Sequence, residues 1–326
     1  MDSLQAHPKR TLIALLIVAI VVLTVSPWLD LQSIRSADIR QQILWDIRLP
    51  RLLFAFLAGC GLALCGLVFQ AMFHNPLATP FTLGVASGAS LGAAVSVYLG
   101  LNFLLLGLSA QTLSAFAGAL ISISLVYFIS RLRSGFSTET LLLTGVAISF
   151  FFSSLILLVQ YLSDVNDAFQ IIRWLMGSLT VVGYDDVRQL APFVIIAALV
   201  IIGFSRELNL LMAGDDIAAS RGVNVNRLRY LLFLVTSLCV GAIVALCGPI
   251  GFVGMMVPHI CRLLIGQDHQ WLIPASLLFG GSFLIICDTL ARIIIAPAEL
   301  PVGVITTLLG GPFFLWLLIR NKRLAA

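Results

Sequence analysis

The sequence predicts an all-α membrane protein with about ten transmembrane helices. Of its 326 residues, 60% are hydrophobic and only 10% are charged, whereas soluble globular chains carry roughly 25% charged residues. The apolar residues fall into blocks of about 17–24, the length at which a helix crosses a hydrocarbon core of ~30 Å. Because backbone polar groups must pair internally in lipid, such blocks favour helices over the alternating strands of a barrel.

Hydropathy places ten spans along the chain. Nine follow plainly from length and apolar content, whereas the eighth is short and contains Pro258, His259 and Arg262. The first follows Lys9 and Arg10 without a small-x-small cleavage site after it, so we expect an uncleaved helix rather than a signal peptide. The spans are predicted at residues 11–27, 51–73, 82–99, 110–130, 140–161, 190–204, 230–247, 250–265, 272–291 and 302–319.

The distribution of Lys and Arg supports the eighth span and predicts the orientation. If all ten segments cross, both termini are cytoplasmic, together with 12 of the 19 basic residues, in agreement with the positive-inside rule. If the eighth did not cross, the basic C-terminal tail would move outside and this bias would weaken. The basic residues are dispersed between apolar blocks, which argues against nucleic-acid binding despite a net charge of +4.

Residues 1–326 are expected to form a single transmembrane domain. The sequence has no fixed-period repeat, no low-complexity segment and no polar stretch long enough for a soluble domain. Its six cysteines lie in or at the ends of apolar blocks, without CxxC pairs or the His spacing of a zinc site. We therefore expect reduced packing cysteines and no metal site.

Span three contains Gly84, Gly88 and Gly92, spaced four residues apart. Small residues at i, i+4 and i+8 stack on one face of a helix and let a second helix approach closely. The stripe therefore predicts helix packing and carries no information on a substrate.

Span five carries three polar residues, Ser149, Ser153 and Gln160. At 100° per residue they fall within roughly 40° of one another on one helix face. Such a stripe could line a water-filled path. From the residues alone, hydrogen bonding between helices is the alternative.

The longest predicted cytoplasmic loop, residues 205–229, contains a short helix between two glycines. Asp215 and Asp216 suit a helix N-terminus and Arg221 suits a C-terminus. Gly222 can take the left-handed conformation that closes a helix. A two-turn helix is thus expected beneath the membrane. An ordinary capped loop and a docking element are equally well supported by these residues.

Asp288 and Arg292 lie four residues apart near the outer end of span nine. They can pair along the helix, which lowers the cost of placing charges in the membrane. A structural ion pair is one interpretation, and a proton relay or a docking charge is another. A relay would need a chain of ionisable groups through the bilayer, and only His259 joins Asp288 as a candidate.

The sequence contains no nucleotide-binding loop. A P-loop ends in Gly-Lys-Ser or Gly-Lys-Thr, and the two lysines, Lys9 and Lys322, lie outside any such motif. Ser, His, Asp and Cys residues form no catalytic spacing, so no catalytic residue is expected and the chain is not predicted to be an enzyme.

Five stretches, read together, form a long and ordered pattern. They are Asp46–Arg51, Gln70–Pro80, Leu83–Gly88, Gly248–His259 and Glu299–Phe314. Through them, and over nearly its whole length, the chain resembles the iron-chelate (siderophore or haem) and cobalamin permeases of ABC importers. The resemblance implies a type II importer permease, whose ten-helix protomer surrounds a central path with a second copy of itself or a homologous permease.

The resemblance also implies partners on both sides of the membrane. A cytoplasmic ABC ATPase, which would bind ATP and Mg, docks below, a periplasmic substrate-binding protein docks above, and the chain itself holds no cofactor. Arg48, Arg51 and Arg292 match arginines that receive glutamates of the binding protein, a role that suits guanidinium forks. The segment that matches the coupling helix to the ATPase comprises Asp215, Asp216, Ile217, Ala218, Ala219, Ser220, Arg221 and Gly222.

By the same resemblance, Ser137, Thr138 and Glu139 match the cytoplasmic gate at the start of span five. Glu139 departs from the small hydroxyl residue of the cobalamin member. The resemblance also favours the path interpretation of the polar stripe on span five.

Substrate identity is predicted from one stretch. Residues 75–90 look more like the ferric siderophore branch than the cobalamin branch, so we expect a ferric siderophore, then haem, then cobalamin, carried across a bacterial inner membrane. A bulky chelate needs a wide, mildly polar path, which leaves selectivity mainly to the binding protein. A proton-coupled secondary transporter using Asp288 and His259 is the alternative from another class. A membrane-embedded enzyme is a third, for which no residues suggest a reaction.

Overall fold

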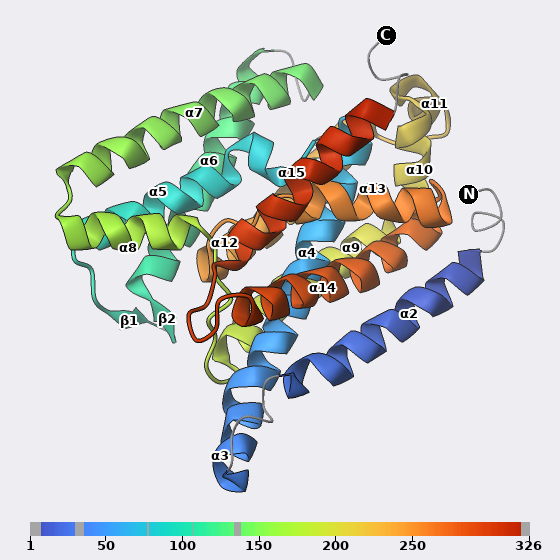
Figure 1. Cartoon of the computed structure of the whole chain (residues 1–326). Coiled ribbons are helices and arrows are strands. Elements are labelled where there is room, and N and C mark those ends of the chain that lie inside the picture. Colours follow the sequence, from blue (N-terminus) through green and yellow to red (C-terminus); the bar gives the residue numbers. More distant parts are fainter. Residues whose placement is uncertain (1–7, 30–35, 77, 106, 134–137, 321–326) are drawn as a thin grey trace.

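The computed structural model describes residues 8–29, 36–76, 78–105, 107–133 and 138–320. Within these ranges the chain is a helical bundle with one short hairpin, so the predicted all-α class is confirmed (Figure 1). The elements of the first half are α2 (Pro8–Val25), the 3-10 turn η1 (Ser26–Trp28), α3 (Ala37–Gln42), the π-helical turn η3 (Ile43–Arg48), α4 (Leu49–Met72), the 3-10 turn η4 (Pro80–Leu83), α5 (Val85–Tyr98), the antiparallel strands β1 (Leu104–Leu105) and β2 (Leu108–Ser109), α6 (Ala110–Arg133) and α7 (Thr138–Leu162).

The second half of the chain is helical between short connections. Its elements are α8 (Val165–Leu175), α9 (Asp185–Gly203), α10 (Ser205–Ala213), α11 (Asp215–Ser220), α12 (Val225–Cys247), α13 (Val253–Ile265), α14 (His269–Ile293) and α15 (Val302–Arg320). The helices α10 and α11 lie at one end of the bundle and α3 at the other (Figure 1). These are the predicted cytoplasmic and outer ends.

The ten predicted spans correspond to ten apolar helices. Seven helices in the described part of the chain are long and apolar enough to cross a membrane, and three shorter apolar helices accompany them, Val85–Tyr98, Val253–Ile265 and Val302–Leu317. The doubtful eighth span is α13, which is short and contains Pro258. That this helix crosses the membrane stays a prediction from the charge distribution.

The helix α4 forms the centre of the bundle. In its most apolar window 83% of residues are buried, against 67% for α12 and α14 and 28% or less for α2, α6, α7 and α9. The close approach to α13 depends on Gly66, because a Cβ there would lie 1.7 Å from the carbonyl oxygen of Gly254. The exposed apolar side chains of the peripheral helices suit contact with lipid or with another protein.

Two of the three glycines predicted in span three lie where α5 meets α6. A Cβ on Gly88 or Gly92 would come within 2.6 or 2.0 Å of a backbone carbonyl oxygen of α6. Gly84 is a correction. It precedes α5, which begins at Val85, and has φ of 78°, a left-handed conformation that favours glycine. It therefore starts the helix, and it is also closely packed, since a Cβ there would lie 3.1 Å from Ser122 Oγ of α6 and 3.0 Å from Ile148 Cγ2 of α7.

Three helical segments were not predicted. The helix of span two is preceded by α3 and η3, so the continuous helical segment runs over Asp38–Met72. The amphipathic helices α8 and α10 carry too many polar residues to register as apolar blocks. All six cysteines are buried and free, as expected.

Candidate functional site

A groove that contains five polar side chains lies along α5 and α7. It has a volume of about 480 Å³ and is lined by Ser149, Ser153 and Gln160 of α7, by Ser87 and Ser90 of α5, and by apolar side chains including Phe81, Leu175 and Pro249. The three residues of the predicted stripe therefore do share one surface. Ser149 donates its hydroxyl hydrogen to the carbonyl oxygen of Gly145 at 2.9 Å, which leaves the oxygen free to accept from a solute.

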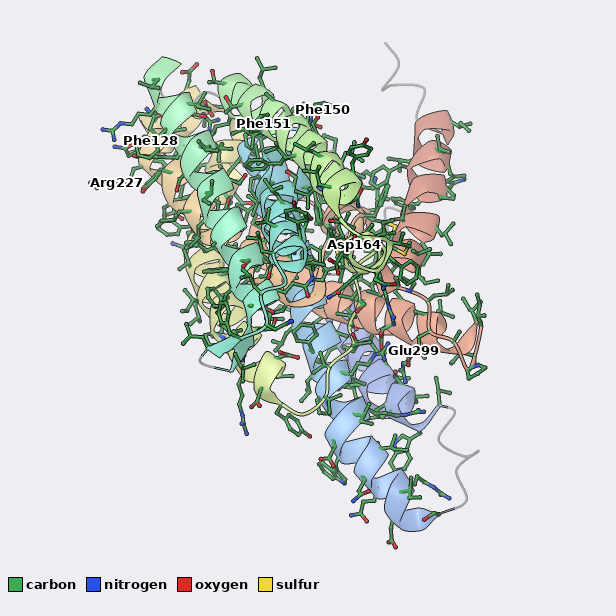
Figure 2. The ribbon with its side chains drawn as sticks, turned by 90° about the vertical axis from the view of Figure 1, so that its left-hand side faces the viewer. Phe128, Phe150, Phe151, Asp164, Arg227 and Glu299 are labelled. Carbon is green, nitrogen blue, oxygen red and sulfur yellow. The ribbon has the colours of Figure 1, made fainter. Side chains whose placement is uncertain are left out.

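The remainder of the exposed α7 surface is strongly apolar. Phe150, Phe151, Leu157 and Tyr161 are each more than half exposed, and the first two project from the upper part of the helix (Figure 2). Such a surface must be covered by lipid or by protein, because contiguous exposed apolar patches are uncommon on stable monomers in water. The serines thus interrupt a face that is otherwise suited to packing.

The predicted short helix beneath the membrane is present as α11. It begins after Gly214, carries Asp215 and Asp216 in its first turn, and ends at Ser220, two residues before Gly222, whose φ is +85°. Asp215 also anchors the helix, because Arg229 Nη2 at the start of α12 lies 2.8 Å from Asp215 Oδ1. The arginine of this pair is buried and the carboxylate is half exposed. The segment is therefore held on one side by a buried cation.

The two faces of α11 differ in exposure. Ala218 is fully buried, whereas Ile217 is 49% exposed and Ala219 is exposed. A partner that approaches from the predicted cytoplasm would meet a small apolar surface flanked by carboxylates and Arg221. This is the kind of rigid, shallow surface that can fit into a groove of another protein.

At the outer end, Asp288 is held between two arginines. Arg51 donates from Nε and Nη2 to Asp288 Oδ1 at 3.0 and 2.8 Å, and its Nη1 lies 2.8 Å from Glu299 Oε2. Arg292 Nε lies 3.3 Å from Asp288 Oδ2, so the predicted pairing along span nine is present. The network joins α4 to α14.

The three predicted docking arginines are engaged in contacts within the protein. Arg51 is buried, and its guanidinium is engaged by two carboxylates, a geometry that does not favour direct contact with a partner. Arg48 donates from Nη1 to the carbonyl oxygens of Pro27 and Leu29. Arg292 is partly buried, at 17% side-chain exposure. The outer arginines thus support the fold as well as facing the outer surface.

Sequence reasoning missed Arg173. It lies on α8, is exposed, and its guanidinium has no ion pair or hydrogen bond within the described ranges. It borders an outer pocket of about 550 Å³ together with Arg51, Glu299 and the hydroxyls of Ser178 and Thr180. The only signal in the sequence was one arginine in a polar connection that had not been recognised as a helix.

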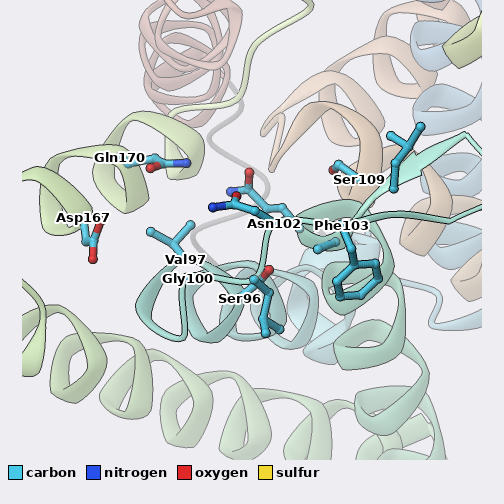
Figure 3. Close-up of a pocket in the computed structure, with 12 residues that line it drawn as sticks. Ser96, Val97, Gly100, Asn102, Phe103, Ser109, Asp167 and Gln170 are labelled. Carbon is cyan, nitrogen blue, oxygen red and sulfur yellow. The ribbon is translucent and has the colours of Figure 1, made fainter.

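A second outer pocket, of about 480 Å³, lies where the α5–β1 loop meets α8. Gln170 of α8 and Asn102 of the loop face each other across it, with Asp167 and Ser96 nearby (Figure 3). The Ser96 hydroxyl is buried and has no hydrogen-bond partner among the described residues. This surface is polar and distinct from the groove on α7.

The predicted gate can be placed only in part. Ser137 lies outside the described residues, and Thr138 and Glu139 begin α7. The proton-relay candidates are separate. Asp288 is enclosed by arginines. The ring of His259 packs against Phe313 and Phe314, with ring centroids 6.1 and 6.4 Å apart. This arrangement favours a structural role for Asp288.

Comparison with known proteins gives consistent matches over most of the chain. The FecCD transport family matches residues 11–320. The hemin transport system permease protein HmuU of Yersinia pestis is 39% identical, covering 87% of this chain and 85% of the relative. The cobalamin import system permease protein BtuC of Halobacterium salinarum is 41% identical, covering 88% of this chain and 75% of the relative. A solved inward-facing metal-chelate type ABC transporter has a TM-score of 0.87 at 31% identity, covering 95% of this chain and 99% of that one.

Proposed function

Because the chain belongs to the FecCD transport family, we propose that it is the permease subunit of a metal-chelate ABC importer and that its substrate is a ferric siderophore. Permeases of this family are transport components rather than enzymes. ATP and Mg would be bound by a separate ATPase subunit. The protein would lie in a bacterial inner membrane as a multi-pass protein with both termini in the cytoplasm, in line with the distribution of basic residues.

The groove on α5 and α7 carries this proposal. It brings Ser149, Ser153 and Gln160 of α7 onto one surface with Ser87 and Ser90 of α5, and most other exposed residues of α7 are apolar. If α7 packs near the same helix of a second copy, or of a homologous permease, the two grooves enclose a wide and mildly polar path. Hydroxyl and amide groups suit a chelate that must pass without being held tightly.

The two ends of the bundle suit two different partners. Residues 215–222 would couple to the ATPase through the exposed face of α11, while residues 137–139 would gate the path beside it. The outer end would receive the binding protein. Arg48, Arg51 and Arg292 are the predicted docking residues, and Arg173 supports the proposal further because its guanidinium is exposed and unpaired among the described residues.

Two observations favour an iron chelate over other substrates, one from the sequence and one from a relative. Residues 75–90 resemble the siderophore branch, and HmuU is named for hemin, itself an iron chelate. BtuC is named for cobalamin, so haem and cobalamin are the alternatives within the same site. A proton-coupled transporter is disfavoured because the Asp288 carboxylate is paired with two buried or partly buried arginines.

The test is uptake into liposomes that contain the permease, its ATPase and its binding protein. We expect ATP-dependent entry of a ferric siderophore in preference to hemin and cobalamin. Ser153→Leu should reduce the initial rate several-fold, because the larger side chain narrows the groove. Ser154→Leu is the matched control, since Ser154 is adjacent and exposed but does not line the groove. Uptake without ATP hydrolysis, or equal effects of both substitutions, would contradict the proposal.

A further inference from the structure

A pocket on the predicted cytoplasmic side gathers three arginines around an apolar floor. It has a volume of about 470 Å³ and lies between α10 and the start of α12. Arg206, Arg221 and Arg227 line it, and all three are exposed. Their guanidinium groups make no ion pair or side-chain hydrogen bond within the described part of the chain. The floor consists of apolar side chains, Phe204, Leu210, Val223, Leu228 and Leu231.

The pocket also contains one acidic group. Glu207 lines it, and its Oε2 atom is buried without a hydrogen-bond partner among the described residues. Three arginines and one carboxylate leave the pocket with a net charge of +2. A ligand that fits this set carries a negative group for the arginines and a neutral donor for Glu207.

The position of the pocket indicates which source of negative charge is available. Arg227 projects from the edge of the molecule on the same side as Phe128 of α6 (Figure 2). Phe128 is 62% exposed, and the rings of Tyr127 and Tyr230 lie 5.2 Å apart beside it. Tyrosines gathered at the end of apolar helices mark the level of the lipid headgroups. Arg227, and with it the pocket that it lines, is therefore placed where phosphates of the inner leaflet would lie.

From this geometry we infer that the pocket binds the headgroup of an anionic phospholipid with free hydroxyls, phosphatidylglycerol being the simplest case. The phosphate contacts Arg206 and Arg227, and a headgroup hydroxyl donates to Glu207. The acyl chains leave over the apolar floor and continue along the exposed apolar surface of α6. Basic pockets on the cytoplasmic side of transmembrane helices are suited to such headgroups. The assignment rests on the membrane orientation given under the proposed function, and on no part of the transport mechanism.

Docking of the ATPase is the competing explanation for these arginines. Arg221 and Gly222 of the pocket belong to the segment proposed for that partner, whereas Arg206 and Arg227 belong to α10 and α12, away from the exposed face of α11. The lipid explanation also accounts for the apolar floor and for the neighbouring tyrosines. Loss of ATPase binding with unchanged lipid binding in the variant described below would overturn it.

The experiment measures lipid binding to the purified full chain by native mass spectrometry after delipidation. Phosphatidylglycerol, phosphatidylethanolamine and phosphatidylcholine are titrated in parallel, with inorganic phosphate as a separate competitor. We expect phosphatidylglycerol to bind in preference to the other two lipids. The double variant Arg206→Gln with Arg227→Gln should weaken this binding about thirty-fold, since each arginine near the surface contributes about a factor of five.

Two further variants keep the test decisive. Arg10→Gln removes an exposed arginine that does not line the pocket and should leave binding unchanged. Glu207→Gln should preserve phosphatidylglycerol binding, because the amide oxygen still accepts a hydrogen bond. If Glu207→Gln instead abolishes phosphatidylglycerol binding, or if inorganic phosphate displaces the lipid completely, the inference is wrong. Should the double variant not fold, each single variant is expected to lose about five-fold.

The result is separable from the proposed function. Co-purification of the ATPase with the unmodified chain is measured in the same preparations. Failure of that association would count against the importer, while phosphatidylglycerol binding that depends on Arg206 and Arg227 would still stand. Unchanged lipid binding in a folded double variant would reject the lipid site and leave the importer proposal intact.

Discussion

The outer and cytoplasmic ends of the molecule use arginine in opposite ways. At the outer end, Arg51 is buried and shared between Asp288 and Glu299, with Arg292 on the other side of Asp288. At the cytoplasmic end, Arg229 is buried and forms an ion pair with Asp215. The other arginines beside α11 are exposed and make no side-chain pair in the described structure.

This difference follows from burial. A guanidinium removed from water must be paired, because an uncompensated buried charge costs several kcal/mol. The outer network therefore joins α4 to α14, and its members are committed to the fold. The exposed arginines of the cytoplasmic end are solvated by water, so they need no partner within the protein and can bind a ligand. Motif position alone does not separate these two uses.

The largest expected effect is that of removing the carboxylate from the outer network. Asp288→Asn leaves the buried Arg51 with Glu299 alone, and breaking a buried pair in this way costs about 3–5 kcal/mol. We expect a clear fall in the midpoint of thermal unfolding in detergent. The matched change at the cytoplasmic end is Asp216→Asn, whose carboxylate is exposed and makes no ion pair among the described residues. It should cost about 1 kcal/mol or less, because it removes only a favourable charge at the start of α11.

Equal losses for the two substitutions would show that the ends do not differ as described. A neutral pair in place of the buried one, Arg51→Met with Asp288→Leu, gives a further check. Replacing both partners by apolar residues is often neutral, so this double variant should unfold closer to the unmodified chain than Asp288→Asn does.

The contrast also shows what could be predicted from the sequence. The ten spans, the helix at 215–222 and the Asp288–Arg292 pair follow from local spacing, because apolar length and an i,i+4 separation act within one segment. The ion pair from Arg51 to Asp288 joins residues 237 positions apart, and no local pattern encodes it. Without that pair, the family resemblance was the only guide to Arg51, and it predicted a docking residue.

The helices that escaped prediction share one property. Both α8 and α10 mix polar and apolar residues, so a hydropathy window averages them out. Arg173 was missed as a site residue with α8, and Leu208 and Leu211, the buried residues of α10, lay within a segment read as a loop. The groove could be predicted only as a stripe on α7, because Ser87 and Ser90 join it through tertiary packing.

The second prediction tests whether the exposed face of α11 contacts the ATPase. Ala219→Arg places a long charged side chain on that face, and disruption at the centre of an interface typically costs about 2 kcal/mol or more. We expect the ATPase to be lost from the purified complex. Ala218→Arg is a poorer test, because Ala218 is buried and its replacement would disturb α11 itself.

The control for this change is Ala213→Arg, which introduces the same side chain at an exposed position at the end of α10. It should leave the association intact. Retention of the ATPase by Ala219→Arg would show that α11 does not form the contact and would move the coupling role elsewhere on the cytoplasmic end.

The smallest expected effect concerns the one outer arginine that behaves like those of the cytoplasmic end. Arg173→Glu reverses an exposed, unpaired charge, and we expect it to weaken the binding protein's affinity about five- to tenfold at low ionic strength. Salt should diminish the difference, because exposed charges are screened. Arg188→Glu is the control, since Arg188 is exposed but already pairs with Asp185. Similar losses of affinity for both variants would indicate that the overall charge of the outer surface, rather than a docking contact, sets the affinity. A loss confined to Arg173→Glu would show that an exposed, unpaired guanidinium marks the docking residue better than its position in a motif.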